Sequence, residues 1–269
     1  MKLNRIPYVG RRMEQAIRRV KLAGYRPEVI EQEEAARWDQ AGLDFERARQ
    51  KFDNARSKLG GKPFDPTRDS IHWILAAAVE QRFRPRRILE LGTFTGEFTA
   101  LLAELYPEAE IVTVDLPETD PLLQGMYGRK KPATLEREMT LRSANLSRSN
   151  VTVVKSNSFF LLDAVRGPFD VVWVDAGHKF PDVAWDLCNA FYLVRTGGIV
   201  MADDVTRNLE FSSKNLGPDT EIVLSYVAER TEMPVHYFLK RRNEASYLNP
   251  PATKHVAWCE KPASWPPRA

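Results

Sequence analysis

Five short apolar segments alternate with helical patterns between residues 86 and 204, and this alternation constrains the fold more than any other feature. The segments are RRILELG (86–92), EIVTVD (110–115), VTVVK (151–155), FDVVWVD (169–175) and GIVMADD (198–204). Strands that are apolar on both faces are typical of a parallel sheet covered by helices. The connecting helical patterns lie near 96–105, 133–147, 158–165 and 181–195. The sequence therefore predicts a βαβ repeat with right-handed crossovers.

Two more strands are predicted at the C-terminal end, VHYFLKR (235–241) and KHVAWCE (254–260), after a helix near 219–231. Because only a turn containing Asn249-Pro250-Pro251 separates them, they must pair antiparallel or lie apart.

Residues 1–66 are predicted to form a helical extension, with helices over 10–24 and 27–59, ahead of a domain spanning 67–269 that opens with a helix over 67–83. The second helix carries an apolar stripe with bulky residues seven apart and alanines between them: Trp38, Phe45, Phe52 and Leu59, with Ala41, Ala48 and Ala55. One interpretation is that the stripe docks onto the chain's own domain. The competing interpretation is a helix pair across a homodimer through residues 27–59.

Charge and composition exclude several classes of protein. A net charge of +3 is too small to indicate a nucleic-acid partner, although residues 1–25 and the Arg129-Lys130-Lys131 cluster are basic. No apolar run is long enough to cross a membrane. With no apolar signal core at the N-terminus, a cytoplasmic protein is expected. Cys188 and Cys259 form neither a disulfide framework nor a metal cluster, and both are expected in the core.

The turn after the first strand carries glycines in the segment ILELGTFTGEF. Gly92 and Gly96 let the backbone approach a ligand closely at a helix start, and Glu90 precedes them. Asp115 ends the second strand, where a carboxylate can accept both hydroxyls of a ribose. The spacing E-x-G-x-x-x-G differs from the G-x-G-x-x-G of dinucleotide sites. The pattern indicates a nucleoside-binding site.

These motifs, with D-x-G-H on the fourth strand and G-G-x-x-x-x-D-D on the fifth, resemble those of class I S-adenosylmethionine-dependent methyltransferases. The resemblance covers about Ser70 to Lys261. Within that superfamily, VDAGHKFPDVAWDLCNAFYLVRTGGIVMADD is similar to bacterial small-molecule O-methyltransferases, including those of antibiotic sugars. The resemblance implies an α/β fold with a Rossmann-like, doubly wound, seven-stranded sheet whose last strand is antiparallel.

The resemblance also implies a role for individual residues in binding S-adenosylmethionine. Glu90, Gly92 and Gly96 would line the methionine portion, and Asp115 would hold the ribose. Asn157 and Ser158, at the end of the third strand, would lie near the adenine. The set of expected cofactor-binding residues is completed by Thr93, Phe94, Leu116 and Asp175.

Three carboxylates are expected to converge where the fourth and fifth strands end. Asp175 ends one strand and Asp203-Asp204 end the other, and the resemblance makes the two strands neighbours. Carboxylate oxygens suit Mg²⁺ or another hard divalent metal, which the resembling sugar enzymes hold here. Successive strand residues point to opposite faces, so Asp203 and Asp204 need not both reach one site. In this alternative, one of them only caps a turn, and Asp175 only orients the cofactor.

His178 follows Asp175 in a loop at the ligand-binding edge of the sheet, which makes it the preferred general base with Asp175 as its catalytic neighbour. The helix after it carries a core stripe of Val183, Leu187, Phe191 and Val194. The long segment 116–136 is expected to act as a loop-like lid.

The sequence thus predicts a methyltransferase that acts on a hydroxyl of a small molecule or sugar and uses S-adenosylmethionine, with a divalent metal as an open question. Two alternatives are an RNA or protein methyltransferase recruited by the basic N-terminus, and a nucleotide-binding module without catalysis.

Overall fold

The fold is centred on a seven-stranded sheet of order β3-β2-β1-β4-β5-β7-β6. The structure is a computed structural model that describes residues 24–127, 132–207, 217–243, 246 and 253–265. β7 runs antiparallel to its neighbours β5 and β6, and the other neighbouring pairs are parallel. The predicted fold class is therefore confirmed. The strands are β1 (Arg87–Leu91), β2 (Glu110–Asp115), β3 (Val151–Lys155), β4 (Phe169–Val174), β5 (Val194–Thr206), β6 (Val235–Leu239) and β7 (Lys254–Glu260).

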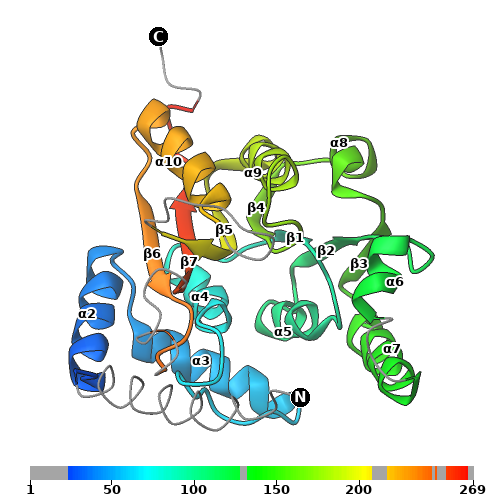
Figure 1. Cartoon of the computed structure of the whole chain (residues 1–269), viewed down its shortest axis with the longest axis horizontal. Coiled ribbons are helices and arrows are strands. Elements are labelled where there is room, and N and C mark those ends of the chain that lie inside the picture. The colour runs from blue at the N-terminus through cyan, green and yellow to red at the C-terminus, as the bar shows by residue number, and fades with distance from the viewer. Residues whose placement is uncertain (1–23, 128–131, 208–216, 244–245, 247–252, 266–269) are drawn as a thin grey trace, which may run out of the picture.

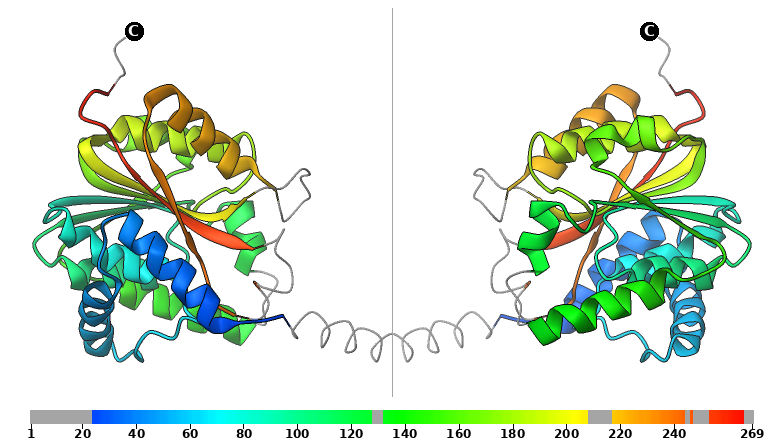
Figure 2. Two further views of the ribbon diagram at one scale, coloured as in Figure 1. Left: turned by 90° about the vertical axis from the view of Figure 1, so that its left-hand side faces the viewer. Right: turned by 90° about the vertical axis from the view of Figure 1, so that its right-hand side faces the viewer.

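Helices cover both faces of the sheet (Figures 1 and 2). One face carries α2 (Pro27–Gln40), α3 (Phe45–Lys58), α4 (His72–Ala78), the short 3-10 helix η1 (Val79–Gln81) and α5 (Glu97–Leu105). The other carries α9 (Asp182–Leu193) and α10 (Asp219–Thr231). The remaining helices are α6 (Pro121–Tyr127), α7 (Pro132–Leu146), η2 (Ser158–Phe160) and α8 (Leu161–Ala164).

Alternate residues of each strand enter two different hydrophobic cores. Ile88 and Trp173 lie in the core beneath α3 to α5, whereas Leu89 and Val172 lie in the core beneath α9. This alternation explains the continuously apolar strands, because both faces of a sheet between two helical layers exclude water. Three residues of the stripe predicted on the helix after β4, Val183, Leu187 and Phe191, lie on α9 in the second core, whereas Val194 enters that core from β5.

The predicted single helix over 27–59 is wrong, because the chain forms α2 and α3 with a break between them. Gly42 in the break has a φ of 63°, which favours glycine. Asp44 then caps α3, since its Oδ1 accepts a hydrogen bond from the backbone N–H of Arg47 at 2.9 Å. The glycine and the aspartate are the local signals for this break.

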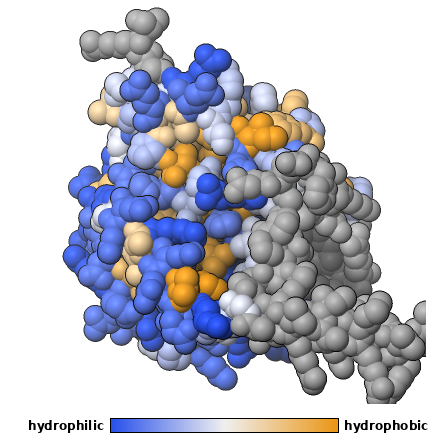
Figure 3. All heavy atoms as spheres, turned by 60° about the vertical axis from the view of Figure 1, so that its left-hand side comes forward, coloured by the Kyte–Doolittle hydropathy of each residue, from blue (hydrophilic) through white to orange (hydrophobic). Residues whose placement is uncertain are grey.

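The apolar stripe of α2 and α3 packs onto the chain's own core. Trp38 and Phe52 are buried, and the Trp38 ring centroid lies 5.0 Å from that of Phe238 in β6. Glu34 of α2 is buried too, and its Oε2 accepts a hydrogen bond from the backbone N–H of Leu239 at 3.0 Å. The side that carries α2 comes forward in Figure 3, where hydrophilic residues predominate. The domain boundary at residue 66 stays a prediction.

Three smaller expectations are corrected by the structure. The segment 116–136 is largely helical, because α6 and the start of α7 occupy it. The helix expected over 67–83 is shorter, and consists of α4 and η1. Cys188 is exposed on α9, whereas Cys259 is buried as expected.

Several predicted features lie outside the described residues. These are the N-terminal helix and its basic residues, the Arg129-Lys130-Lys131 cluster, and the Asn249-Pro250-Pro251 turn. Within the described ranges, no helix combines the length and apolar character needed to cross a membrane.

Candidate functional site

The turn from β1 to α5 lies against the end of β4. Three residues of this turn have positive φ angles: Gly92 (94°), Phe94 (48°) and Gly96 (72°). A Cβ atom on Gly92 would lie 2.3 Å from the backbone oxygen of Asp175, so a side chain does not fit at this contact. The predicted glycine turn and the predicted aspartate therefore belong to one site.

Asp115, the last residue of β2, fixes the same turn through its carboxylate. Its Oδ1 accepts a hydrogen bond from the backbone N–H of Leu116 at 2.9 Å, and its Oδ2 accepts one from that of Phe94 at 3.2 Å. Oδ2 also pairs with Nη1 of Arg142, a buried residue of α7, at 3.0 Å. The same guanidinium donates to the carbonyl oxygen of Phe94. The sequence contains no motif that marks Arg142, because its partner lies 27 residues away.

Glu90 is buried beneath the turn. Its Oε2 accepts a hydrogen bond from Oγ1 of Thr99 at 2.5 Å, while Thr93 and Thr113 place their hydroxyl oxygens 2.6 Å apart. Burial raises the pKa of Glu90 to about 7, although hydrogen bonds from Thr113 and Thr99 oppose that rise. A carboxyl group in this state ionises readily once a cation lies beside it.

Glu90→Gln is expected to change how stability depends on pH. A pKa raised from 4.5 in the unfolded chain to about 7 in the folded one stabilises the protonated acid, so this contribution is complete below about pH 4.5 and is lost as the pH rises through about 7. At about 1.36 kcal/mol per pKa unit, the loss is on the order of 3 kcal/mol.

Urea unfolding at about pH 5 and about pH 8 measures this loss in the free energy of unfolding. The wild type should lose stability between the two conditions, and the glutamine variant should lose less. Glu97→Gln, at an exposed position of α5, is the matched control and should behave like the wild type. An equal loss in the wild type and in Glu90→Gln would contradict the prediction.

The end of β3 supplies the predicted residues Asn157 and Ser158. Asn157 caps η2, since its Oδ1 accepts a hydrogen bond from the backbone N–H of Phe159 at 2.9 Å. The backbone N–H of Ser156 donates to the carbonyl oxygen of Asp115 at 2.9 Å. The ends of β2 and β3 are therefore joined directly.

Two residues of α9 that were not predicted from the sequence lie beside the end of β3. The exposed ring of Trp185 stacks on Phe159 with ring centroids 5.2 Å apart. Asp186 is buried, and burial raises its pKa to about 6, an effect that Ser158 and the Gly177 backbone oppose. Asp186 therefore lies near the loops that follow β3 and β4, although within the described part of the chain neither of its buried carboxylate oxygens has a hydrogen-bond partner.

A bulge in β5 gives Asp203 and Asp204 a common neighbour. The pairing of β5 with β7 shifts between Ala202 and Val205, and Asp204 has a φ of 53°. In a regular strand the two carboxylates would point to opposite faces, whereas here both contact the ammonium group of Lys240. The bulge therefore brings together two acids that strand geometry alone would separate.

Two lysines of the C-terminal hairpin hold these acids. Lys240 follows β6, contacts Oδ2 of Asp203 and lies 2.5 Å from Oδ1 of Asp204, while Lys254 opens β7 and contacts Oδ2 of Asp204. Burial favours the neutral acid, but the lysines lower the pKa of Asp204 to about 2. Burial also acts to lower the pKa of Lys240, yet Asp203 and Asp204 raise it above its usual value. Both acids are therefore held as ion pairs.

Asp175 and His178 complete the cluster. Burial and the neighbouring Asp203 raise the pKa of Asp175 well above its usual value. His178 Nε2 lies 3.5 Å from Oδ1 of Asp175 and 3.9 Å from Oδ2 of Asp204, and the imidazole is 34% exposed. Burial lowers the pKa of His178 against the opposing charges of Asp204 and Asp203, so the ring is neutral at neutral pH and can accept a proton.

The aspartates do not fit the predicted divalent-metal site. Both oxygens of Asp204 and one oxygen of Asp203 already contact ammonium groups, and the Lys240 nitrogen contacts one oxygen of each acid. Across the described ranges, no group of three His, Cys, Asp or Glu side chains is arranged as a metal site. The positive charge at this cluster comes from lysine.

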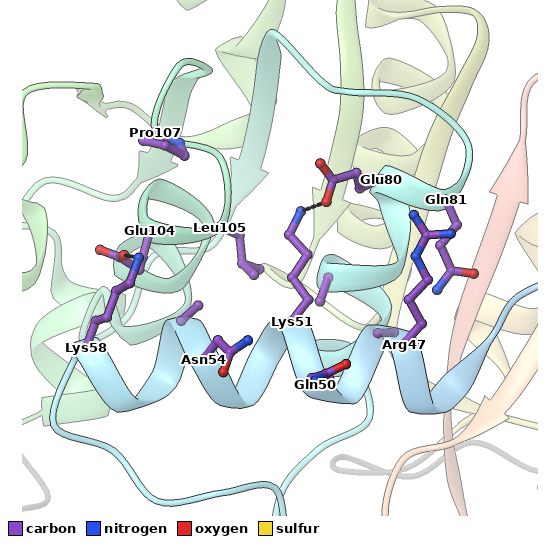
Figure 4. Close-up of a pocket in the computed structure, with 13 residues that line it drawn as sticks. Arg47, Gln50, Lys51, Asn54, Lys58, Glu80, Gln81, Glu104, Leu105 and Pro107 are labelled. Carbon is purple, nitrogen blue, oxygen red and sulfur yellow. Dashed lines mark hydrogen bonds and ion pairs between the residues drawn. The ribbon is translucent and has the colours of Figure 1, made fainter.

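A surface hollow of about 490 Å³ lies elsewhere, between α3 and the end of α5, which carries Glu104 and is followed by Pro107 (Figure 4). Lys58 pairs with Glu104 at 3.0 Å across it, and Lys51 pairs with Glu80. Its lining includes none of the predicted site residues. The hollow is therefore separate from the candidate site at the strand ends.

Three comparisons with known proteins show what this chain is similar to. Residues 89–205 match a family model described as a methyltransferase domain. The O-methyltransferase hkm8 of Aspergillus hancockii is 30% identical over 143 residues, which are 52% of this chain and 50% of that protein. The chain thus spans about half the length of the curated relative it matches. An O-methyltransferase from Bacillus cereus, solved in complex with SAH, shares the fold with a TM-score of 0.50 at 15% identity, covering 88% of this chain and 100% of that one.

Proposed function

We propose that this chain is an S-adenosylmethionine-dependent methyltransferase acting on a hydroxyl of a small molecule or sugar. The match of residues 89–205 to a methyltransferase-domain model supports this proposal. The observation that carries the proposal is the contact between Gly92 and the backbone of Asp175. It joins a turn suited to a nucleoside with a cluster that contains His178, a neutral base. Cofactor and acceptor can therefore meet at this contact.

The residues on the cofactor side suit S-adenosylmethionine. Asp115 presents a carboxylate to the ribose hydroxyls, and Glu90 can ionise beside the cationic amino group of the methionine portion. Asn157 and Ser158 are assigned to the adenine. When bound, the cofactor supplies an electrophilic methyl group on its sulfonium. The remaining contacts are assigned to Gly92, Thr93, Phe94, Gly96, Leu116 and Asp175.

On the acceptor side, His178 is the base that takes the hydroxyl proton. Its neutral imidazole can accept that proton, and the charges of Asp204 and Asp203 stabilise the imidazolium that forms. Asp175 also belongs to the β4 end that touches Gly92. The chain thereby positions its base next to the cofactor turn, as in-line transfer requires.

A hydroxyl acceptor is supported by the relative from Aspergillus hancockii, which is named as an O-methyltransferase. Phe94 and Phe180 are 44% and 49% exposed, and lie in the turns that carry Gly92 and His178. Exposed aromatic rings beside a base offer an apolar surface to the body of an acceptor. We assign these two rings to the acceptor pocket, while the backbone of Phe94 stays assigned to the cofactor.

Asp115→Ala is expected to weaken cofactor binding by about 100-fold. Two charge-assisted hydrogen bonds to the ribose would be lost, which together contribute about 3 kcal/mol. Calorimetric titration with S-adenosylhomocysteine measures the effect, and transfer of a labelled methyl group to a panel of hydroxyl compounds tests turnover. Asp120→Ala, five residues along, is the matched control. Unchanged affinity in the Asp115 variant would remove Asp115 from the cofactor site.

Three finer expectations from the sequence also enter the proposal. We place the protein in the cytoplasm and assign it no nucleic-acid partner. A homodimer through residues 27–59 would have to use the outer faces of α2 and α3, because the apolar stripe is buried within the chain. Light scattering of the purified protein tests the dimer.

A further inference from the structure

We propose that Lys240 supplies the positive charge that a divalent metal would supply to the aspartates of β4 and β5, so that this chain works without such a metal. The reaction itself rests on the proposed function. The claim about which cation occupies the cluster rests only on the contacts of the described residues.

The first support is the position of the ammonium group. Lys240 Nζ contacts Oδ2 of Asp203 and lies 2.5 Å from Oδ1 of Asp204, so it bridges the two acids. Oδ1 of Asp203 has no hydrogen-bond partner among the described residues, but a metal chelated by both carboxylates would still have to share an oxygen of Asp204, because both of its oxygens already contact ammonium groups. Two cations cannot share this place, because they repel each other at such distances.

The second support is that Lys240 is built into the fold. It is only 8% exposed, and both of its backbone polar groups are engaged. Its N–H donates to the carbonyl oxygen of Lys254 at 2.9 Å, and its carbonyl oxygen accepts a hydrogen bond from the N–H of Ile71 at 2.9 Å. These bonds fix the backbone of Lys240, and burial restricts the movement of its side chain.

The third support comes from the neighbouring strand. Lys254, which opens β7, contacts the other oxygen of Asp204, and β7 lies between β5 and β6 (Figure 1). A divalent ion would therefore have to displace the ammonium groups of Lys240 and Lys254 to bind both oxygens of Asp204. The two lysines act as positioning residues, since they hold the acids that flank His178.

Titration with Mn²⁺, followed by electron paramagnetic resonance of the free ion, tests the proposal without cofactor or acceptor. The wild type should not bind Mn²⁺ at the cluster. Lys240→Met should bind it at least about tenfold more tightly, because it leaves two carboxylates without their shared cation. Adding Asp203→Asn to that variant should abolish the gain. Lys51→Met, which removes an ion-paired lysine from α3, is the matched control and should behave like the wild type.

Lys240→Arg keeps the charge, so it should exclude Mn²⁺ as the wild type does, even if Lys240→Met does not fold. Stoichiometric Mn²⁺ binding by the wild type that is lost in Asp203→Asn would overturn the proposal. A folded Lys240→Met variant with no gain would overturn it as well. Absence of methyl transfer would instead count against the proposed function, since these titrations require no turnover.

Discussion

Replacing His178 by glutamine is expected to lower the rate of methyl transfer by about 10²-fold to 10⁴-fold, the usual contribution of a positioned general base. Glutamine keeps a polar side chain of similar length but cannot take the hydroxyl proton. Affinity for S-adenosylhomocysteine should stay near that of the wild type, because His178 belongs to the acceptor side of the site. Single-turnover kinetics with a labelled methyl group, alongside calorimetry, separates the two effects.

The pH profile provides the second measurement for His178. Burial lowers the pKa of His178 below the usual 6.5. Activity should therefore persist below pH 6.5 and fall only at the lower pH at which the ring becomes protonated. The glutamine variant should lack this acid limb. His236→Gln changes a histidine of β6 and is the matched control. Full activity in His178→Gln would show that His178 is not the base, and Asp175 would then be the next candidate.

Trp38→Ala is expected to lower the free energy of unfolding by about 3 to 5 kcal/mol, the usual cost of removing a buried tryptophan. Trp38 is 1% exposed, and its ring centroid lies 5.2 Å from that of Phe45 and 5.0 Å from that of Phe238. These contacts join α2 and α3 to the edge strand β6. Urea unfolding monitored by circular dichroism measures the change.

Val29→Ala, at a position 48% exposed on the same helix, is the matched control and should change stability by less than about 0.5 kcal/mol. A loss below about 1 kcal/mol in Trp38→Ala would show that the N-terminal helices contribute little to the core. A loss of the expected size would show that they stabilise the sheet edge that holds Lys240.

Most of the fold could be predicted because its strands are short, apolar and separated by helical patterns. The antiparallel end also followed from the sequence, since only a turn was expected between the last two predicted strands. The break at Gly42 was missed because apolar residues at heptad spacing continue through it, although a positive φ glycine and a capping aspartate interrupt the helix.

The candidate site was only half predictable, for reasons of chain separation and local geometry. Gly92 and Asp175 lie on strands whose order follows from the fold, and they do meet. Lys240 is 36 residues from Asp204 in a hairpin with no motif, so the sequence did not indicate their pairing. The bulge at Asp204 changes which way two adjacent side chains point, and alternation along a strand cannot anticipate it.

The place of β7 in the sheet has a consequence for synthesis of the chain. Lys240 and Lys254 both belong to the last hairpin, and β7 must insert between β5 and β6. A nascent chain emerges from its N-terminal end, so the acids of β5 appear well before their cations. Until the last strand is made, those acids remain hydrated and the site is incomplete. Assembly of the site therefore waits until the β6–β7 hairpin has been made.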